Sequence, residues 1–287
     1  MTILEGIQRS TEFLAKKGVD SPRLQTELLL AHALKLPRMR LYLNFERELS
    51  DSERNSFREL IKRRGQREPL QHIIGSVSFC GLEIAVNRAA LIPRSETELL
   101  AERGWQHLNQ LSTINSQPST ALDWGTGSGC LAIALSVKCP SAQVYASEIS
   151  PEAIALARQN AARHGVADRI RFLEGDGFAA VPAGTQFDLI IGNPPYIPTA
   201  EIETLQPEVR DYDPRQALDG GPDGLDCMRR LAREAAAFIK PDARVMLEFG
   251  EGQAEAVREI FTQQKWIVEG IVADYTRRPR IVIARHG

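Results

Sequence analysis

The sequence predicts an α/β fold whose main part is a doubly wound, mostly parallel sheet of seven strands. From residue 120 onward, short apolar runs alternate with segments of helical length, which is typical of parallel strands joined by helices. A glycine-rich loop at residues 125–129 follows the first run, and two prolines end the fourth. The last two runs are separated by too few residues for a parallel crossover, so we expect them to be antiparallel.

The chain of 287 residues has the composition of an ordinary globular protein, with 43% hydrophobic and 25% charged residues and a net charge of −2. This balance argues against a strongly cationic nucleic-acid binder. No apolar stretch has the length of a membrane span, and the first residues lack a signal-peptide pattern. We therefore expect a cytoplasmic protein, without a membrane or a direct nucleic-acid partner, and a monomer. Cysteines without CxxC spacing and scattered histidines predict no metal site.

Residues 1–70 are predicted to form a small helical domain that docks the substrate, with a net charge of +4, against −6 for the remainder. Ser21 before Pro22 indicates an N-cap, and Ser50 with Glu53 forms a capping-box pattern. The basic residues 62–64 and Arg67 could meet an acidic partner or ribosomal RNA, but a solvated helix end is the favoured interpretation.

Residues 71–92 are interpreted as a β-hairpin linker, with strands at Ile73 to Phe79 and Leu82 to Val86 around a turn at Cys80-Gly81. A helix from about Ser95 to Leu111 and a polar, turn-rich stretch at 113–120 follow. Residues 93–287 then form the third predicted region. Its strands are expected at Thr120–Trp124, Gln143–Glu148, Ile170–Leu173, Phe187–Gly192, Arg244–Phe249, Trp266–Ala273 and Arg280–Ala284. Its helices are expected at Gly129–Lys138, Pro151–Arg163, Leu225–Ile239 and Gln253–Gln264.

The motif Asn193-Pro194-Pro195-Tyr196 lies directly behind the predicted buried strand 187–192. Ligands of open α/β sheets bind at the carboxyl ends of strands. The Asn193 side-chain oxygen and the Pro194 carbonyl could each accept one N–H of a planar –NH2 group and so orient its lone pair, while Tyr196 could lie against the group. The alternative is a rigid turn in which Asn is only a turn former.

A second motif, Gly125-Thr126-Gly127-Ser128-Gly129, follows the first strand and opens a helix. Glu148 ends the next strand, where a carboxylate could bind ribose hydroxyls, and Asp176 follows the third strand, where it could bind an adenine amine. A dinucleotide site is one interpretation, although the loop is GxGxG and not GxGxxG. S-adenosylmethionine fits better, because it brings its own leaving group and requires little acid–base apparatus from the protein. Helix caps and loop solvation are the alternative roles of the acids.

These residues resemble a class I S-adenosylmethionine-dependent methyltransferase, and more narrowly the PrmC/HemK family of peptide chain release factor glutamine methyltransferases. The resemblance runs nearly from end to end. It is carried by residues 27–32, 68–75, 91–98, 123–129, 193–196, 217–221 and 223–225. It implies a Rossmann-like methyltransferase fold and methyl transfer to the amide nitrogen of the glutamine in a release factor's Gly-Gly-Gln motif.

The resemblance also implies roles for individual residues. The cofactor-binding set is Gly125, Thr126, Gly127, Ser128, Gly129, Glu148, Asp176, Gly177 and Asn193. The catalytic set is Asn193, Pro194 and Tyr196, and the substrate-binding set is Asn193, Pro194, Pro195, Tyr196 and Arg94. Glu98 is expected with Arg94 at the pocket mouth.

Three positions depart from the family pattern: Ser95 replaces a usual Pro, Glu148 a common Asp, and Gly177 a bulkier residue that often packs on adenine. A sister family that modifies a ribosomal protein glutamine also carries Ser after Pro-Arg, so this substrate stays an alternative. A DNA adenine methyltransferase is a further alternative, which would require a marked basic surface. A non-catalytic adenosine-binding module is the last, and intact Asn193 and Tyr196 argue against it.

Overall fold

In the computed structural model, which describes residues 1–114 and 117–287, the chain separates into two units. The first comprises Met1–Ser76 together with Gln206–Tyr212, and the second comprises Val77–Leu205 and Asp213–Gly287. The sequence analysis did not anticipate that residues 206–212 belong with the helical unit. The assignment of 1–70 as a docking domain, 71–92 as a linker and 93–287 as a methyltransferase domain stays a prediction. Residues 115 and 116 of the predicted polar stretch lie outside the described residues.

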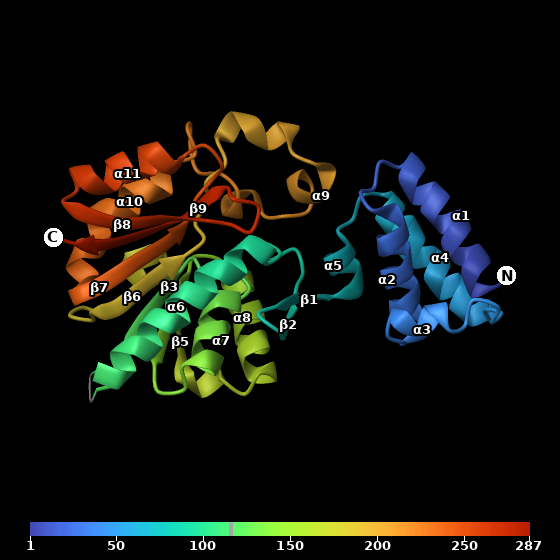
Figure 1. The fold of residues 1–287 in the computed structure, drawn as a ribbon, viewed down its shortest axis with the longest axis horizontal. Coiled ribbons are helices and arrows are strands. Elements are labelled where there is room, and N and C mark those ends of the chain that lie inside the picture. The colour runs from blue at the N-terminus through green and yellow to red at the C-terminus, as the bar shows by residue number, and fades with distance from the viewer. Residues whose placement is uncertain (115–116) are drawn as a thin grey trace. The chain divides into compact units, whose positions relative to one another are not determined.

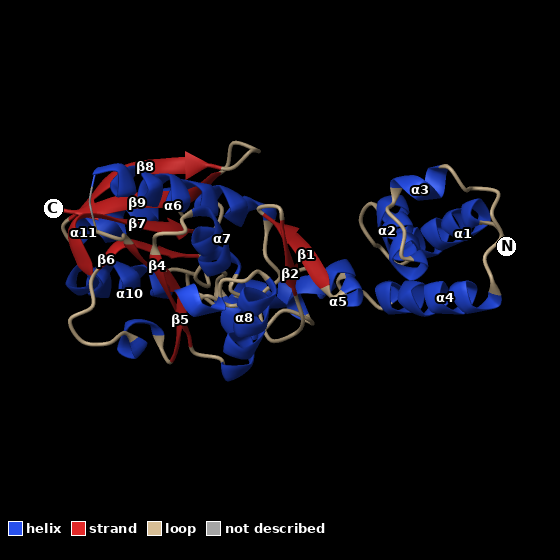
Figure 2. Cartoon of the chain, turned by 90° about the horizontal axis from the view of Figure 1, so that it is seen from below, coloured by secondary structure: helices blue, strands red, loops and turns tan. Residues whose placement is uncertain are grey.

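The first unit is helical (Figure 2). Its helices are α1 (Ile3–Lys16), α2 (Pro22–Leu34), α3 (Met39–Tyr42), α4 (Asp51–Gly65), α5 (Leu70–Ile74) and α9 (Pro207–Arg210). The predicted capping box at the start of α4 is confirmed, because Ser50 and Glu53 exchange side-chain and backbone hydrogen bonds. Pro22 opens α2 as predicted, but Ser21 has a left-handed backbone and makes no side-chain cap bond.

Three arginines of the basic cluster at the end of α4 are paired within this unit. Arg63 donates two hydrogen bonds to Glu68, and both Arg64 and Arg67 bind Glu208 of α9. The Arg64 side chain is only 4% exposed, whereas Lys62 is exposed. The favoured interpretation of a solvated helix end was therefore wrong for Arg64 and Arg67, because their acidic partner comes from a distant segment of the chain.

The predicted first strand of the hairpin was placed too early. Residues Leu70–Ile74 form α5, which ends at Gly75 with φ +88°, a left-handed conformation that stops a helix. The strands that follow are β1 (Ser76–Phe79) and β2 (Leu82–Ala85), which pair with each other. The turn at Cys80-Gly81 is as predicted.

The second unit is built on a seven-stranded sheet in the order β5-β4-β3-β6-β7-β9-β8 (Figure 1). The strands are β3 (Thr120–Trp124), β4 (Gln143–Glu148), β5 (Ile170–Glu174), β6 (Phe187–Gly192), β7 (Ile239–Glu248), β8 (Trp266–Ala273) and β9 (Pro279–His286). The first five are parallel, and β9 is antiparallel to both β7 and β8. The fold class and the antiparallel ending are confirmed. Strand order reverses at β3, which makes the crevice between β3 and β6 the expected ligand site.

Helices cover both faces of this sheet. They are α6 (Ser95–Ile114), α7 (Cys130–Lys138), α8 (Pro151–Arg163), α10 (Asp226–Glu234) and α11 (Ala254–Gln263). Side chains of β3 alternate between two cores: Ala121 packs with α6 and α7, and Leu122 packs with α10 and α11. This period of two is what a strand buried on both faces requires. Among the described residues, none of the helices combines the length and apolarity needed to cross a membrane.

The segment between α10 and β7 differs from the prediction. The predicted helix 225–239 is shorter, because α10 gives way to a 3-10 turn at Ala235–Phe238. Strand β7 begins at Ile239, five residues before the predicted start, and its pairing with β6 jumps from Ile239 to Arg244. The jump coincides with Pro241, which cannot donate to the ladder, and with Asp242 at φ +64°.

Candidate active site

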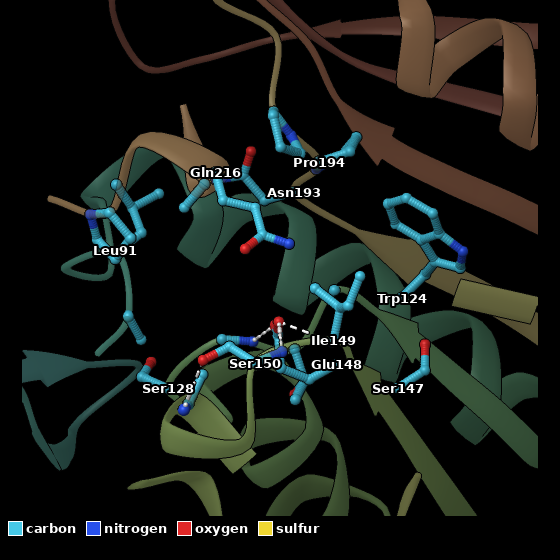
Figure 3. A pocket seen from close by; sticks show the side chains of 18 of the residues that line it. Leu91, Trp124, Ser128, Ser147, Glu148, Ile149, Ser150, Asn193, Pro194 and Gln216 are labelled. Carbon is cyan, nitrogen blue, oxygen red and sulfur yellow. Dashed lines mark hydrogen bonds between the residues drawn. The ribbon is translucent and has the colours of Figure 1, made fainter. Parts of the chain in front are cut away.

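A cavity of about 360 Å³ opens at the carboxyl ends of β3, β4 and β6 in the second unit. Asn193 and Pro194 project from one side, and Glu148, Ile149 and Ser150 lie on the facing side (Figure 3). Residues 89–97 and 214–219 supply further parts of the wall. The crevice predicted from strand order is therefore hollow, and most of the predicted site residues line it.

The glycine loop of residues 125–129 forms one wall. Gly125, Gly127 and Gly129 all have positive φ, and nothing lies within 4 Å of where a Gly125 Cβ would be. The backbone is thus bare toward the cavity, which allows close approach of a ligand. Asp123 holds the loop from behind: its Oδ2 accepts hydrogen bonds from the Thr126 hydroxyl at 2.5 Å and from the Ala132 amide at 3.1 Å. Burial raises the pKa of Asp123 to about 7.

Glu148 lies at the end of β4 and ties the loops after β3 and β4 together. One carboxylate oxygen accepts from the Gly127 amide at 2.9 Å, and the other accepts from the amides of Ile149 and Ser150 at 2.9 and 3.0 Å (Figure 3). These bonds fix the carboxylate against the backbone. Its oxygens retain lone pairs that could accept hydroxyl groups of a ligand.

Asp176 and Gly177 follow β5 and also line the cavity. The Asp176 carboxylate pairs with Arg230 at 2.5 Å, a partner that the sequence did not indicate. Gly177 has φ +57°, and a Cβ there would lie 2.6 Å from the Trp124 indole nitrogen. Trp124 itself lines the cavity. The departure at position 177 therefore has a physical cause, because an aromatic side chain from β3 occupies the space that a larger residue would need.

The strand-ending motif places Asn193, Pro194 and Pro195 on the cavity wall. The Asn193 Nδ2 donates a hydrogen bond to Thr97 Oγ1 at 3.2 Å. Tyr196 is not among the lining residues; its hydroxyl donates to Glu248 at 3.4 Å. Burial and the neighbouring Glu248 raise the pKa of Tyr196, so the phenol stays protonated.

Arg94 lies on the cavity wall and pairs with Asp213 at 2.6 Å. The Asp213 side chain is 1% exposed, and burial raises its pKa while Arg94 opposes that rise. Glu98, expected near the pocket mouth, does not line the cavity. It accepts the Cys80 amide at the hairpin turn instead. Ser95 is the first residue of α6, and its hydroxyl donates to Glu96.

Four residues at this site had no role assigned from the sequence: Asp123, Trp124, Thr97 and Glu248. The first three lie within segments 123–129 and 91–98, which carry the family resemblance, but only their neighbours were given roles. Glu248 lies at the end of a predicted strand, a signal that could have selected it. In the part of the chain that the structure describes, no three His, Cys, Asp or Glu side chains converge as metal ligands do.

Comparison with known proteins agrees with this geometry. The family model of the PrmC N-terminal domain matches residues 5–75, and that of the methyltransferase small domain matches residues 106–206. A release factor glutamine methyltransferase from Geobacter sulfurreducens is 47% identical over 263 residues, covering 91% of this chain and 89% of the relative. This chain belongs to the release factor glutamine methyltransferase family.

A second relative agrees with this family assignment, and one solved structure agrees with the fold. The release factor glutamine methyltransferase of Chlorobaculum tepidum is 39% identical over 282 residues, covering 97% of this chain and 95% of the relative. A methyltransferase structure from Pyrococcus furiosus superposes with a TM-score of 0.51 at 22% identity, covering 71% of this chain and 89% of that one. The latter similarity concerns the fold of the catalytic unit. As a member of this family, the chain is an S-adenosylmethionine-dependent protein-glutamine methyltransferase.

Proposed function

We propose that this enzyme transfers a methyl group from S-adenosylmethionine to the side-chain amide nitrogen of the glutamine in the Gly-Gly-Gln motif of peptide chain release factors. The observation that carries the proposal is the position of Asn193 and Pro194, which face the glycine loop and Glu148 across one cavity (Figure 3). The names of the relatives supply the substrate class. Modification of release factors makes a role in translation termination the expected consequence.

The residues of the cavity fit the cofactor. The bare backbone of 125–129 leaves room for a closely bound ligand, and the fixed carboxylate of Glu148 offers acceptors for two vicinal hydroxyls. We propose that Asp176, Gly177 and Asn193 complete the cofactor site, with Trp124 as an apolar wall. The bound cofactor supplies an electrophilic methyl group on a sulfonium sulfur.

The substrate amide has a delocalised and poorly nucleophilic nitrogen. We propose that Asn193 Oδ1 and the Pro194 carbonyl each accept one of its N–H groups, which turns the nitrogen lone pair toward the methyl group. Pro195 keeps the strand end rigid, because its φ is restricted. Tyr196 is proposed to support this end through its Glu248 contact, and Arg94 to hold the 213–219 loop through Asp213.

The first unit is proposed to dock the release factor. It exposes several large apolar side chains: Phe13, Leu24, Met39, Tyr42 and Leu43, with exposures from 39% to 74%. We propose that these side chains contribute apolar contact area to the docking surface. A cytoplasmic monomer that needs no nucleic acid completes the proposal.

The first experiment identifies the substrate class. The purified protein is incubated with cofactor carrying a labelled methyl group and with a release factor, ribosomal proteins or DNA, and the label is located by mass spectrometry. We expect label on the release factor glutamine. Label on a ribosomal protein glutamine or on adenine, with none on the release factor, would overturn the proposal in favour of that substrate.

A second experiment tests how the motif reads the amide. Release factor is presented with Gly-Gly-Gln, Gly-Gly-Asn and Gly-Gly-Glu tips. Asparagine is one methylene shorter, which withdraws the amide by more than about 1 Å from its acceptors, and such a misplacement can reduce the rate about 100-fold. Glutamate has no N–H to donate to two oxygen acceptors. Comparable labelling of all three tips would show that Asn193 and Pro194 do not read the amide.

A further inference from the structure

Three side chains from three distant segments form a hydrogen-bonded chain that starts at the cavity wall, where Asn193 and Thr97 lie. Asn193 Nδ2 donates to Thr97 Oγ1 at 3.2 Å, and Thr97 Oγ1 donates to Glu248 Oε2 at 2.7 Å. Thr97 lies in α6, Glu248 ends β7, and Asn193 follows β6, all within the second unit. We infer that Thr97 and Glu248 are positioning residues that fix which end of the Asn193 amide faces the substrate. The inference deepens the proposed function and rests on it.

The direction of the hydrogen bonds follows from what each group can do. Above its pKa of about 7 the Glu248 carboxylate is ionised and only accepts hydrogen bonds, so at such pH the single hydroxyl proton of Thr97 goes to Glu248. The Thr97 oxygen then has only lone pairs left and must accept from its other neighbour. The –NH2 end of Asn193 can satisfy it, whereas the carbonyl end cannot. Asn193 Oδ1 is consequently left for the cavity, where a substrate N–H requires an acceptor (Figure 3).

Burial makes this arrangement rigid. Thr97 and Glu248 are each 2% exposed, so water has little access to exchange for either partner. The second oxygen of Glu248 accepts from Tyr196, the last residue of the strand-ending motif. One carboxylate thus contacts both ends of the 193–196 segment, directly at Tyr196 and through Thr97 at Asn193.

The buried position of Glu248 is unfavourable for a charged carboxylate. Burial, together with nearby Glu96, raises the pKa of Glu248 to about 7, although the Thr97 hydrogen bond and Arg280 act in the opposite direction. A neutral residue of similar size would avoid this desolvation. A buried acid with a perturbed pKa beside a cavity is typical of a functional site. The hydrogen bonds that run from Asn193 through Thr97 to Glu248 require a group at their end that only accepts, and an ionised carboxylate is such a group.

The decisive variant is Thr97→Val, which keeps the shape of the side chain and removes its hydroxyl. Without that partner the Asn193 amide can rotate, and a rotated amide presents donors to the substrate's donors. We expect kcat on release factor to fall about 10- to 100-fold, while KM and the dissociation constant for the cofactor change less than about 2-fold. A kcat within about 3-fold of the unsubstituted protein would overturn the inference.

Two controls separate the hydroxyl from packing. Thr97→Ser retains the hydroxyl in a smaller side chain and should keep kcat within about 3-fold, and a loss as large as that of Thr97→Val would overturn the inference. Thr26→Val makes the same change at a fully buried threonine whose hydroxyl has no hydrogen-bond partner. It should leave kcat unchanged, and thermal unfolding of all variants monitors folding.

Glu248→Met tests the second link, because it removes the acceptor and leaves the Thr97 proton free to turn toward Asn193. We expect a fall in kcat of the same order as for Thr97→Val. Because Glu248 also accepts from Tyr196, the comparison is made in a Tyr196→Phe background, where both changes act through Asn193 and the double variant should be no worse than the poorer single variant by more than about 3-fold. If the fold-losses in kcat of the two single variants multiply in the double variant, the two residues act independently, and the inference that Glu248 acts on Asn193 through Thr97 is overturned.

Asn193→Ala distinguishes failure of the inference from failure of the proposed site. If Asn193→Ala retains near-normal turnover, the proposed role of Asn193 is wrong and the inference falls with it. If Asn193→Ala is inactive but binds cofactor and Thr97→Val is fully active, the proposed role of Asn193 stands and only the positioning role of Thr97 and Glu248 is wrong. Loss of activity in both, with rescue in Thr97→Ser, is the result expected.

Discussion

At the scale of single residues, Glu248 links folding stability to pH. Its folded pKa of about 7 lies above the ordinary value of 4.5, mainly because burial disfavours the charged form. A raised carboxyl pKa means that the folded state holds the proton more tightly than the unfolded state does. This contribution to stability is fully present below about pH 4.5 and is lost as the pH rises through 7.

Glu248→Gln removes this titration and should therefore stabilise the protein increasingly at higher pH. We expect the free energy of unfolding of the variant, relative to the unsubstituted protein, to rise by on the order of 3 kcal/mol between pH 5 and pH 8. Urea unfolding at several pH values measures it. The raised pKa of Asp123 is present in both proteins and cancels. Glu12→Gln, at an exposed site on α1, is the control, and an equal pH response in both variants would contradict the prediction.

Gly177 is the second residue whose environment makes a measurable prediction. Gly177→Ala forces an L side chain to adopt φ +57° and places its Cβ 2.6 Å from Trp124. Gly184 has a similar φ of +78° but nothing within 4 Å, so Gly184→Ala isolates the backbone strain. Gly177→Ala should cost about 1–3 kcal/mol more than Gly184→Ala in urea unfolding, because the close contact adds to the strain. An equal loss of unfolding free energy in the two variants would mean that the Trp124 side chain moves aside without an energetic penalty.

At the scale of elements, the short helix α9 is bound to the end of α4 by charge. Burial raises the pKa of Glu208, but hydrogen bonds from Arg67 and Arg64 outweigh it and hold that pKa below its usual range. Such a group contributes stability above its unfolded pKa and loses that contribution as the pH falls. The pairing anchors residues 206–212, which continue directly into the cavity-lining loop 213–219.

Glu208→Gln should destabilise the first unit by about 3 kcal/mol, because it leaves the buried Arg64 guanidinium without its counter-charge. The loss should shrink at acidic pH, where Glu208 protonates in the unsubstituted protein. Asp211→Asn breaks an exposed pair with Arg210 in the same segment and should cost much less, because solvent screens that pair. Denaturant unfolding of both variants tests this, and matching small losses would show that the Arg64 contact carries little energy.

At the scale of the whole molecule, the proposed function assigns docking to the first unit and chemistry to the second. Met39 and Leu43 are 65% and 74% exposed in the first unit. The double variant Met39→Ser with Leu43→Ser should raise KM for intact release factor about 10-fold and leave kcat unchanged, because apolar contact area is lost in the first unit while the cavity of the second unit is unaltered. Turnover of a short Gly-Gly-Gln peptide should be unaffected.

Ile114→Ser is the matched control for that surface, since Ile114 is 78% exposed at the end of α6 in the second unit. Steady-state kinetics with both substrates decides the question. A KM for release factor that is unchanged in the Met39 and Leu43 variant would remove docking from this part of the first unit.

The elements of the fold were predictable because their signals are local. The seven strands follow apolar runs, and the end of β6 is set by the two prolines behind it, which cannot donate to a ladder. The capping box of α4 lies within four consecutive residues. Errors arose where a local signal was overruled, as at Gly75, which ends α5 where a strand was expected, and at Pro241 and Asp242 in β7.

Only the tertiary structure decided which residues far apart in the chain contact each other. Thr97 and Glu248 are separated by 151 residues and Arg64 and Glu208 by 144, and no local pattern indicates that either pair meets. Trp124 reaches Gly177 because both lie at the carboxyl edge of the sheet. The sequence by itself thus determined the strands, the glycine loop and the Asn193 motif, since each depends on backbone preferences of neighbouring residues. Strand order and helix packing decided which side chains hold that motif in place, because they set the distances between segments.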